Sequence, residues 1–497
     1  MIVTLTIKRK ILTNIKTYMK VEKMSKRWKP FHGIWLALIM LCFVQCKESS
    51  DEDSVVDFDP SKPITVTDFL PKEGGAGSNL ILYGDNFGSD RSRVKVVIGG
   101  KQAPVINVKN GTMYCTVPQG AFDGDIKISV LDREGEEVAR TEAKDVFVYI
   151  KKLLSSTLAG QFYEVTNQFE EKEGPFDDCG GFNNINWFSF DPQNPNHMYV
   201  MAEGSNARLV DLENEYVSYF RTGLSRVSSM AWRIDGNQDM ILPDNHASDT
   251  RVAHHIFSRA NGFAAPGNPI LVNARGVNGV MVHPTNGELY YGGFRANSVF
   301  RYDFEEQKVV AAFPSAYSAN AIYMVVHPSG DYAYLTNFER HYIMKSEYDY
   351  ERKTFKNPYP VAGMPGQRGY ADGVGTFARI DNPVQGVFVK NPDYEGQGGE
   401  QYDYYFCDMG NHAIRKVTPE GRVTTFAGRG NNGTAGYANG DLRAETRFDQ
   451  PRAIAYDEAR ECFYIGERGK NKVIRKIARE TEDDAISDNE EESTDND

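Results

Sequence analysis

Hydrophobic and polar positions alternate through residues 64–149. In the segment 126–130 every second residue is β-branched and apolar, while the residues between them are Lys and Ser. This period of two is typical of a strand with one buried face. Short strands separated by turns predict a β-sandwich over residues 62–150. Further strands are predicted at 80–83, 94–98 and 113–117, with turns at 84–88, 99–100 and 110–111.

A longer region, residues 151–478, repeats one kind of turn signature rich in Asp, Asn, His, Pro and Gly. The signatures recur at intervals of roughly 40 to 65 residues, and each interval has room for a four-stranded blade. Because such sheets repeat radially in a propeller, we predict about six blades. The signatures are Phe190-Asp191-Pro192, Trp232-Arg233-Ile234-Asp235-Gly236, Val282-His283-Pro284, Val326-His327-Pro328, Val389-Lys390-Asn391-Pro392 and Ala455-Tyr456-Asp457.

Four segments of the first region carry a recognisable family pattern. They are 64–71 followed by four small residues at 74–77, then 80–88, 96–100 and Val117-Pro118. Together they resemble the IPT/TIG domain, an immunoglobulin-like sandwich. In bacterial surface proteins such domains often hold a binding module away from the membrane, so the resemblance implies a spacer rather than a ligand-binding domain.

The last two repeats contain near-copies of one string. Residues 411–417 read Asn-His-Ala-Ile-Arg-Lys-Val and residues 471–477 read Asn-Lys-Val-Ile-Arg-Lys-Ile, and 424–428 add Thr-Thr-Phe-Ala-Gly. These strings resemble the NHL repeat, which implies that Asn411 and His412 form a turn and are not catalytic. The predicted fold is therefore all-β, an immunoglobulin-like sandwich followed by a six-bladed NHL-type β-propeller.

An apolar run at residues 34–44 follows a basic stretch and stops just before Cys46. It is shorter than the roughly 20 residues that cross a bilayer, but it suits a secretory signal. A cysteine after such a run resembles a bacterial lipobox, although Gln45 stands where a small residue is usual. The resemblance implies a signal peptide at 1–45, with translation starting at Met24, and a lipid on Cys46.

Residues 46–61 are predicted to be an acidic tether. Their first part, 46–53, resembles the export tag of lipoproteins displayed on the outside of the outer membrane, although a plain solvated tether fits the same composition. We expect the protein to be held at the outer membrane by its lipid anchor alone and to face the cell exterior.

Charge and cysteine content exclude some functions. The 56 basic residues face 68 acidic ones, for a net charge of −12, so the chain lacks the basic surface that follows nucleic-acid phosphates. The acidic residues 479–497 are predicted to be a disordered tail. Without a CxxC pair or zinc-finger spacing, we expect no metal and no cofactor. Four cysteines of the predicted globular domains remain as thiols or bridges, namely Cys115, Cys179, Cys407 and Cys462.

Arginines recur in the loops that should crown one face of the propeller. Guanidinium groups bind carboxylate or sulfate with two hydrogen bonds, and aromatic faces stack on sugar rings. The alternative is that each arginine ties its own blade to the next one. The predicted ligand-binding residues are Arg208, Arg251, Arg295, Arg340, Arg368, Tyr370, Tyr437 and Arg468, with Arg226, Arg275, Arg379, Arg452 and Tyr317 nearby.

Three histidines, His246, His254 and His255, fall in a predicted insertion at 243–257 that also contains two aspartates. A metal site is one interpretation, since six-bladed lyases and lactonases hold a metal in the central channel. Those enzymes draw ligands from several blades, so we favour a solvated polar loop.

These features predict non-catalytic capture of an extracellular poly- or oligosaccharide, acidic in character, through the propeller face. Outer-membrane glycan importers are the expected protein partners. A protein-binding or adhesion scaffold is the first alternative. A lyase or lactone hydrolase is the second, for which no nucleophile, base or orienting group can be assigned.

Overall fold

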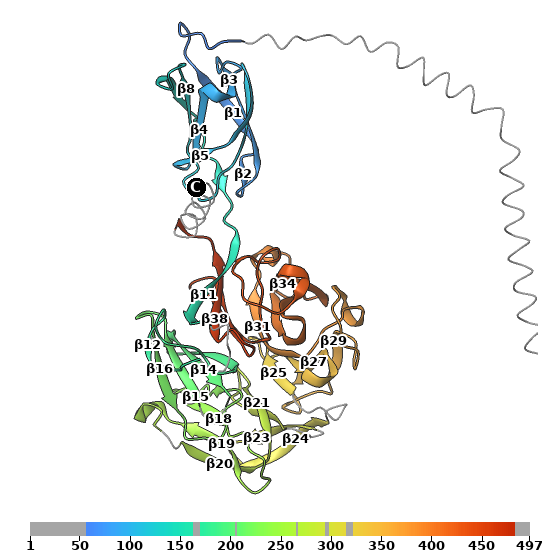
Figure 1. Ribbon diagram of the computed structural model, residues 1–497. Helices are drawn as coiled ribbons and strands as arrows, with labels where there is room; N and C mark the ends of the chain where they lie inside the picture. Colours follow the sequence, from blue (N-terminus) through green and yellow to red (C-terminus); the bar gives the residue numbers. More distant parts are fainter. Residues whose placement is uncertain are drawn as a thin grey trace, which may run out of the picture.

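The computed structural model describes residues 56–162, 169–203, 206–264, 267–293, 298–314 and 322–482. Two β-rich bodies follow one another along the chain, a smaller one and a larger one (Figure 1). Within these ranges no helix is both long and apolar enough to span a membrane. The predicted signal peptide and Cys46 lie outside the described residues.

The first body is a sandwich of two four-stranded antiparallel sheets. Its strands are β1 (Thr65–Leu70), β2 (Glu73–Gly74), β3 (Asn79–Asp85), β4 (Val94–Ile98), β5 (Lys101–Ala103), β6 (Val105–Lys109), β7 (Thr112–Thr116), β8 (Ile126–Leu131), β9 (Glu137–Glu142) and β10 (Val148–Tyr149), with a short η1 turn (Arg91–Arg93). The sheets run β1-β3-β7-β6 and β5-β4-β8-β9, and β10 pairs with β2. Alternate side chains such as Leu82, Val96 and Ile128 fill the core between them. The predicted sandwich is confirmed.

The second body is a propeller. Within the described residues it consists of six antiparallel sheets arranged radially, so the predicted six blades are confirmed (Figure 1). Blades 1 to 3 contain β12 (Gly174–Pro175), β13 (Ile185–Asp191), β14 (Asn194–Ala202), β15 (Asn206–Asp211) and β16 (Tyr216–Arg221); β17 (Ala231–Trp232), β18 (Met240–Pro243), β19 (Val252–Phe257), η3 (Arg259–Asn261) and β20 (Asn268–Asn273); and β21 (Val277–Val282), β22 (Leu289–Gly293), β23 (Ser298–Asp303) and β24 (Lys308–Pro314).

Blade 6 joins the two ends of the propeller. Its outer strand β11 comes before blade 1 in the chain and pairs antiparallel with β38. Because the first and last strands share one sheet, their hydrogen bonds close the ring. Blades 4 to 6 contain β25 (Ile322–Val326), β26 (Tyr332–Asn337), η4 (Phe338–Arg340), β27 (Tyr342–Asp349), β28 (Thr354–Phe355) and β29 (Tyr359–Ala362); β30 (Gly373–Val374), η5 (Gly375–Phe377), β31 (Pro383–Lys390), η6 (Pro392–Tyr394), β32 (Tyr402–Asp408), η7 (Met409–Asn411), β33 (Ala413–Val417) and β34 (Arg422–Gly428); and β11 (Leu153–Gly160), α3 (Gly430–Gly433), β35 (Gly440–Asp441), β36 (Pro451–Asp457), β37 (Cys462–Glu467) and β38 (Val473–Arg479).

Every predicted turn signature falls where the innermost strand of a blade meets the second strand. His283 shows why such a turn recurs. It is fully buried, its Nδ1 accepts from the Thr285 N–H at 3.4 Å, and its Nε2 hydrogen bonds with the Gly330 carbonyl of the next blade at 3.0 Å. The turn therefore also joins neighbouring blades.

The two near-copied strings form the same buried arrangement. In blade 5, Met409–Asn411 form the turn between β32 and β33, and His412 adopts a left-handed conformation with φ 54°. Arg415 is fully buried and donates to the Asp408 carboxylate at 2.8 Å. Asn411 donates to the same carboxylate at 2.8 Å. In blade 6 the corresponding residues are Glu467, Asn471 and Arg475.

The prediction of a polar loop over residues 243–257 is wrong for the last six of them. Residues 252–257 form β19, which pairs with β18 and β20 inside blade 2. His254 is fully buried and packs against Tyr291 at 4.6 Å between ring centroids. Because His254 interrupts the alternation of apolar and polar residues, the sequence pattern did not predict this strand.

The structured chain continues beyond the predicted boundary at Ala478. Arg479 is the last residue of β38 and pairs with Leu153 of β11. Glu480 is 2% exposed and its side chain accepts a hydrogen bond from the Lys152 N–H at 2.9 Å. Placing these two residues in a disordered tail was therefore wrong, while residues 483–497 lie outside the described part of the chain.

Cysteines of the described residues are buried and unpaired at all four positions, namely Cys115, Cys179, Cys407 and Cys462. Burial raises the pKa of Cys115 to about 12. Each thiol therefore behaves as a small apolar group in its domain core.

Candidate functional site

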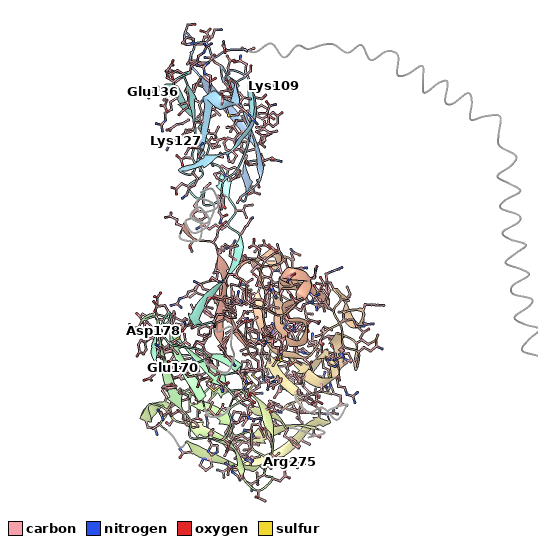
Figure 2. The ribbon with its side chains drawn as sticks, in the orientation of Figure 1. Lys109, Lys127, Glu136, Glu170, Asp178 and Arg275 are labelled. Atoms are coloured by element: carbon pink, nitrogen blue, oxygen red, sulfur yellow. The ribbon has the colours of Figure 1, made fainter. Side chains whose placement is uncertain are left out.

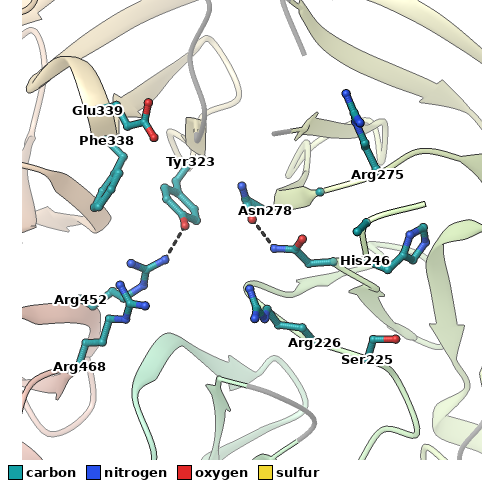
Figure 3. A pocket seen from close by; sticks show the side chains of 13 residues that line it. Ser225, Arg226, His246, Arg275, Asn278, Tyr323, Phe338, Glu339, Arg452 and Arg468 are labelled. Carbon is teal, nitrogen blue, oxygen red and sulfur yellow. Dashed lines mark hydrogen bonds between the residues drawn. The ribbon is translucent and has the colours of Figure 1, made fainter. Parts of the chain in front are cut away.

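A pocket of about 660 Å³ lies at the mouth of the propeller's central channel (Figure 3). Its walls come from loops that lead into blades 2 and 3, from the turns after the second strands of blades 2, 4 and 6, and from the beginnings of innermost strands. Figure 2 places Arg275, one of its lining residues, at the end of the propeller away from the sandwich. The propeller loops therefore converge on one cavity, which is distinct from the sandwich.

The floor of the pocket is closed by aromatic packing. Tyr323 of β25 is 2% exposed and stacks on Trp187 of β13, with 5.9 Å between ring centroids. These strands belong to blades 4 and 1, which face each other across the ring. Gln385 of β31 adds a brace by hydrogen bonding to both backbone groups of Phe188, at 2.8 and 3.0 Å, and by accepting from the Ile454 N–H at 3.3 Å. The pocket is a cup rather than an open tunnel.

Arg452 lies at this floor. It is half-buried, and its Nη2 donates to the Tyr323 hydroxyl at 2.7 Å. Its guanidinium also lies 5.8 Å from the ring centroids of Tyr323 and Phe338, and its buried Nε makes no hydrogen bond. Among the described residues no carboxylate forms an ion pair with it. A half-buried cation with a phenol and two aromatic faces around it favours an incoming anion.

Three further arginines stand at the rim with weak acidic partners (Figure 3). Arg226 and Arg468 share the Glu203 carboxylate at 3.9 and 3.7 Å. Arg275 lies 3.5 Å from Asp249, which is 69% exposed. Exposed pairs at such distances contribute little energy, so these guanidiniums remain available to a ligand. Glu339 is the acidic residue of the lining itself.

The Glu203 carboxylate shows how this region stabilises negative charge. A hydrogen bond from Asn184 at 2.6 Å and the positive charges of Arg468, Arg226 and Arg452 lower the pKa of Glu203, against the opposing effect of burial. A ligand carboxylate at the same rim would experience the same positive charges.

The wall on the side of blade 2 is held by buried hydrogen bonds. Asp244 is 2% exposed and accepts from the Ser225 and Arg226 backbone N–H groups, at 2.8 and 3.4 Å, and from Arg251 at 3.0 Å. Asn245 donates to the side chain of Asn278 on blade 3. These contacts fix the loop that carries Arg226 before any ligand arrives.

The predicted binding residues on the face of the propeller do not all meet. Arg468 lines the pocket. Arg251 is not part of the lining but lies next to the pocket residue Ser225. Its guanidinium donates to the Asp244 carboxylate and, at 3.2 Å, to the Ser225 hydroxyl. Arg340 and Arg368 are exposed and are not part of the lining. Arg295, like Tyr317, lies outside the described residues.

Three of the predicted residues lie inside the blades. Arg208 is 1% exposed, packs between the rings of Phe182 and Tyr219, and donates to backbone carbonyls. Tyr370 hydrogen bonds with Thr425 at 2.7 Å, and Tyr437 hydrogen bonds with Thr157 at 2.5 Å. These contacts lie within blades 1, 5 and 6, so the three side chains support their own blades and do not line the pocket. The pocket arginines are instead Arg226, Arg275, Arg452 and Arg468.

Sequence reasoning missed the aromatic part of the site. In the sequence, Tyr323 and Trp187 look like ordinary core residues of buried strands. They meet only because the six blades close into a ring. The sequence does contain one signal for the pocket arginines, which is their position relative to the innermost strands. Arg226 and Arg275 occur just before an innermost strand, and Arg452 occurs at the start of one, where chain segments converge on the channel. Within the described residues no group of three or more His, Cys, Asp or Glu side chains is placed to hold a metal ion.

The first body matches a known family. The model of the IPT/TIG domain matches residues 63–149, which span the sandwich from just before β1 to the end of β10. No curated protein matches the chain.

Solved structures resemble the chain over most of its length. It is 48% identical to an auxiliary nutrient binding protein from Bacteroides thetaiotaomicron, over 86% of this chain and 100% of that one, with a TM-score of 0.73. It is 39% identical to an auxiliary nutrient binding protein from Bacteroides ovatus, over 86% of this chain and 100% of that one, with a TM-score of 0.68. A third protein, from Bacteroides thetaiotaomicron and with a provisional phosphatase name, is 38% identical over 86% and 99%, with a TM-score of 0.73.

These identities and coverages show that the chain belongs to the same family as these Bacteroides proteins. The names of these relatives differ, since two are named for nutrient binding and one for phosphatase activity. The chemistry of the pocket must therefore distinguish the two.

Proposed function

We propose that this protein binds an acidic nutrient glycan without catalysis, through the arginine-lined cup of its propeller. The observation that carries the proposal is Arg452, a half-buried guanidinium at the floor that donates to the Tyr323 hydroxyl and forms no ion pair within 4.0 Å among the described residues. The two relatives named for nutrient binding support the general role.

The composition of the cup supports an anionic sugar in particular. Guanidinium groups bind the planar carboxylate of a uronic acid, or a sulfate, with directed hydrogen bonds. The rings of Tyr323 and Phe338 supply flat apolar surface beside the guanidinium, and aromatic surfaces of this kind pack against the apolar faces of sugar rings. Polar and apolar surfaces together match an acidic saccharide better than an inorganic ion.

The binding residues are tested by calorimetric titration with uronic-acid, sulfated and neutral oligosaccharides. Arg452→Ala and Arg275→Ala should each weaken binding of the acidic ligands by about 1.5–3 kcal/mol, the usual contribution of a hydrogen bond to a charged group. Arg352→Ala, at an exposed turn after β27, is the matched control and should bind like the wild type. Equal affinity of the wild type for acidic and neutral saccharides would contradict the proposal.

The phosphatase name of one relative calls for a separate measurement. A sugar phosphate monoester also carries an anion that arginines bind. Incubating the protein with such esters and measuring free phosphate separates binding from hydrolysis. We expect binding heat without phosphate release. Turnover that is lost in Arg452→Ala would replace non-catalytic capture with an enzymatic function.

The same proposal includes the place of the protein at the cell. Lipid on Cys46 and the acidic tether would hold the sandwich and propeller outside the outer membrane, with the sandwich as a spacer and a glycan importer as the partner. Cys46→Ala should abolish incorporation of a radioactive fatty acid. Replacing residues 47–53 with neutral ones should keep lipidation and reduce protease accessibility on whole cells. Equal labelling of Cys46→Ala and the wild type would overturn the anchor, and unchanged accessibility would overturn outward display.

A further inference from the structure

The closed floor of the cup limits how a glycan can enter it. The stacked rings of Trp187 and Tyr323 close the channel below. Gln385 ties the innermost strands of blades 5, 6 and 1 together at a nearby level. A polymer therefore cannot thread through the ring. It must either lie across the mouth or insert an end.

The arginines of the cup lie at different depths. Arg226 and Arg275 are at the rim, where 50% and 49% of their side-chain surfaces are exposed. Arg452 is bonded to the floor residue Tyr323. A chain lying across the mouth would contact the rim arginines and leave Arg452 without an anion. A group that projects into the cup reaches Arg452 and passes the rim on the way.

The Nη1 group of Arg452 supports this interpretation. Its contact among the described residues is the Met409 sulfur at 4.0 Å, which is a weak acceptor. A ligand carboxylate at the floor would accept hydrogen bonds from Nη1 and Nη2. The volume of about 660 Å³ falls in the range of roughly 300–1,000 Å³ typical of pockets for compact small ligands.

The geometry points to recognition of a glycan terminus: the cup takes the end of an oligosaccharide or of a short branch, with the anionic group of the terminal residue on Arg452 and the following residues at the rim. This inference rests on the proposed function and adds to it the position of the charge. The substrate class is a saccharide with a terminal uronate or a terminal sulfate.

The test compares two isomeric trisaccharides, each with one uronic acid and two neutral sugars. In one the uronate is terminal, and in the other it is in the middle. We expect the terminal isomer to bind at least about tenfold more tightly by calorimetry, because only it brings a carboxylate to Arg452. Arg452→Ala should remove that difference, and Arg352→Ala should keep it.

The outcomes separate the two proposals. Equal binding of both isomers, weakened to a similar extent by Arg275→Ala and by Arg452→Ala, would overturn terminal recognition and leave acidic-glycan capture standing. Absence of binding by uronate- and sulfate-bearing saccharides of any length would overturn both. Because Arg452 also contacts Tyr323, a Tyr323→Phe variant checks packing: it keeps the ring stack, and it should retain the preference for the terminal isomer.

Discussion

Two sets of arginines in the propeller differ in what surrounds them. Arg415 and Arg475 are fully buried inside blades 5 and 6, and each meets a buried carboxylate and backbone carbonyls. Arg475 also donates to Ser155 on the closing strand β11 at 2.9 Å. Arg452 and Arg275, at the cup, have an aromatic floor and an exposed aspartate as neighbours. The number of acceptors that the fold brings to an arginine therefore separates the structural set from the set that we propose to bind the ligand.

The buried set shows how its acidic partners are affected. Burial raises the pKa of Asp408 to about 6, against the opposing charge of Arg415. Burial likewise raises the pKa of Glu467 to about 7, against the charge of Arg475. Each acid depends on its arginine for compensation, so the two residues act as one unit in the blade.

The largest expected effect on stability comes from removing the arginine of one such buried pair. Arg415→Ala leaves the Asp408 carboxylate buried without its cation, so the free energy of unfolding should fall by about 3–5 kcal/mol. Denaturant titration measures the change, with Arg352→Ala as an exposed control that should shift it by less than about 0.5 kcal/mol. A loss below 1 kcal/mol for Arg415→Ala would show that the buried set is no more structural than the cup set.

A buried histidine of blade 2 links the stability of the propeller to pH. Burial, and to a smaller extent the charge of His255, lowers the pKa of His254 from 6.5 to about 3. Between these pH values the unfolded chain binds a proton at His254 that the folded chain excludes. Its contribution to stability is therefore present above pH 6.5 and falls by about 1.4 kcal/mol for each unit as the pH drops toward 3.

Replacing His254 with phenylalanine should flatten this dependence. We expect denaturant titrations at pH 6.5, 5.5 and 4.5 to show a smaller loss for His254→Phe than for the wild type. Tyr291→Phe changes the packing neighbour but keeps the histidine, and it should preserve the wild-type slope. Equal slopes for His254→Phe and the wild type would mean that His254 does not control the acid response.

The junction of the two bodies offers an intermediate effect. Glu480→Ala removes the acceptor of the Lys152 N–H in a part-buried hydrogen bond, which should cost about 0.5–1.5 kcal/mol, the usual net contribution of one hydrogen bond. Deleting residues 483–497 keeps this contact and should leave the melting temperature unchanged. If the deletion lowers the melting temperature by several degrees, the acidic tail docks on the folded protein.

The smallest expected effect is a gain in ligand affinity from a substitution at the rim of the cup. Glu203 occupies Arg226 and Arg468 in the absence of ligand, so Glu203→Gln should strengthen binding of a uronic-acid oligosaccharide by about 0.5–1 kcal/mol, the scale of an exposed pair. Calorimetry at low and high salt measures it, and the gain should shrink as salt screens the charges. Weaker binding in Glu203→Gln would mean that the glutamate itself contacts the ligand.

The amino-acid sequence by itself determined the architecture. Alternation at 126–130 and the repeated turn signatures reflect local rules, since side chains alternate across any strand and turns need Asn, Asp, Pro and Gly. The two near-copied strings likewise placed the turn at Asn411 correctly. His254 and Glu480 were misplaced because a polar residue in a core, or an acid at a domain boundary, is buried only when distant segments cover it.

The tertiary structure alone decided which arginines line the pocket. Arg208 and Arg468 both occur near a turn of their blade, yet one packs between two rings and the other reaches the pocket. That difference depends on residues far away in the chain, because ring closure sets the neighbours of each loop. The meeting of Trp187 with Tyr323 has the same origin: strands of opposite blades approach only when all six blades close around the channel.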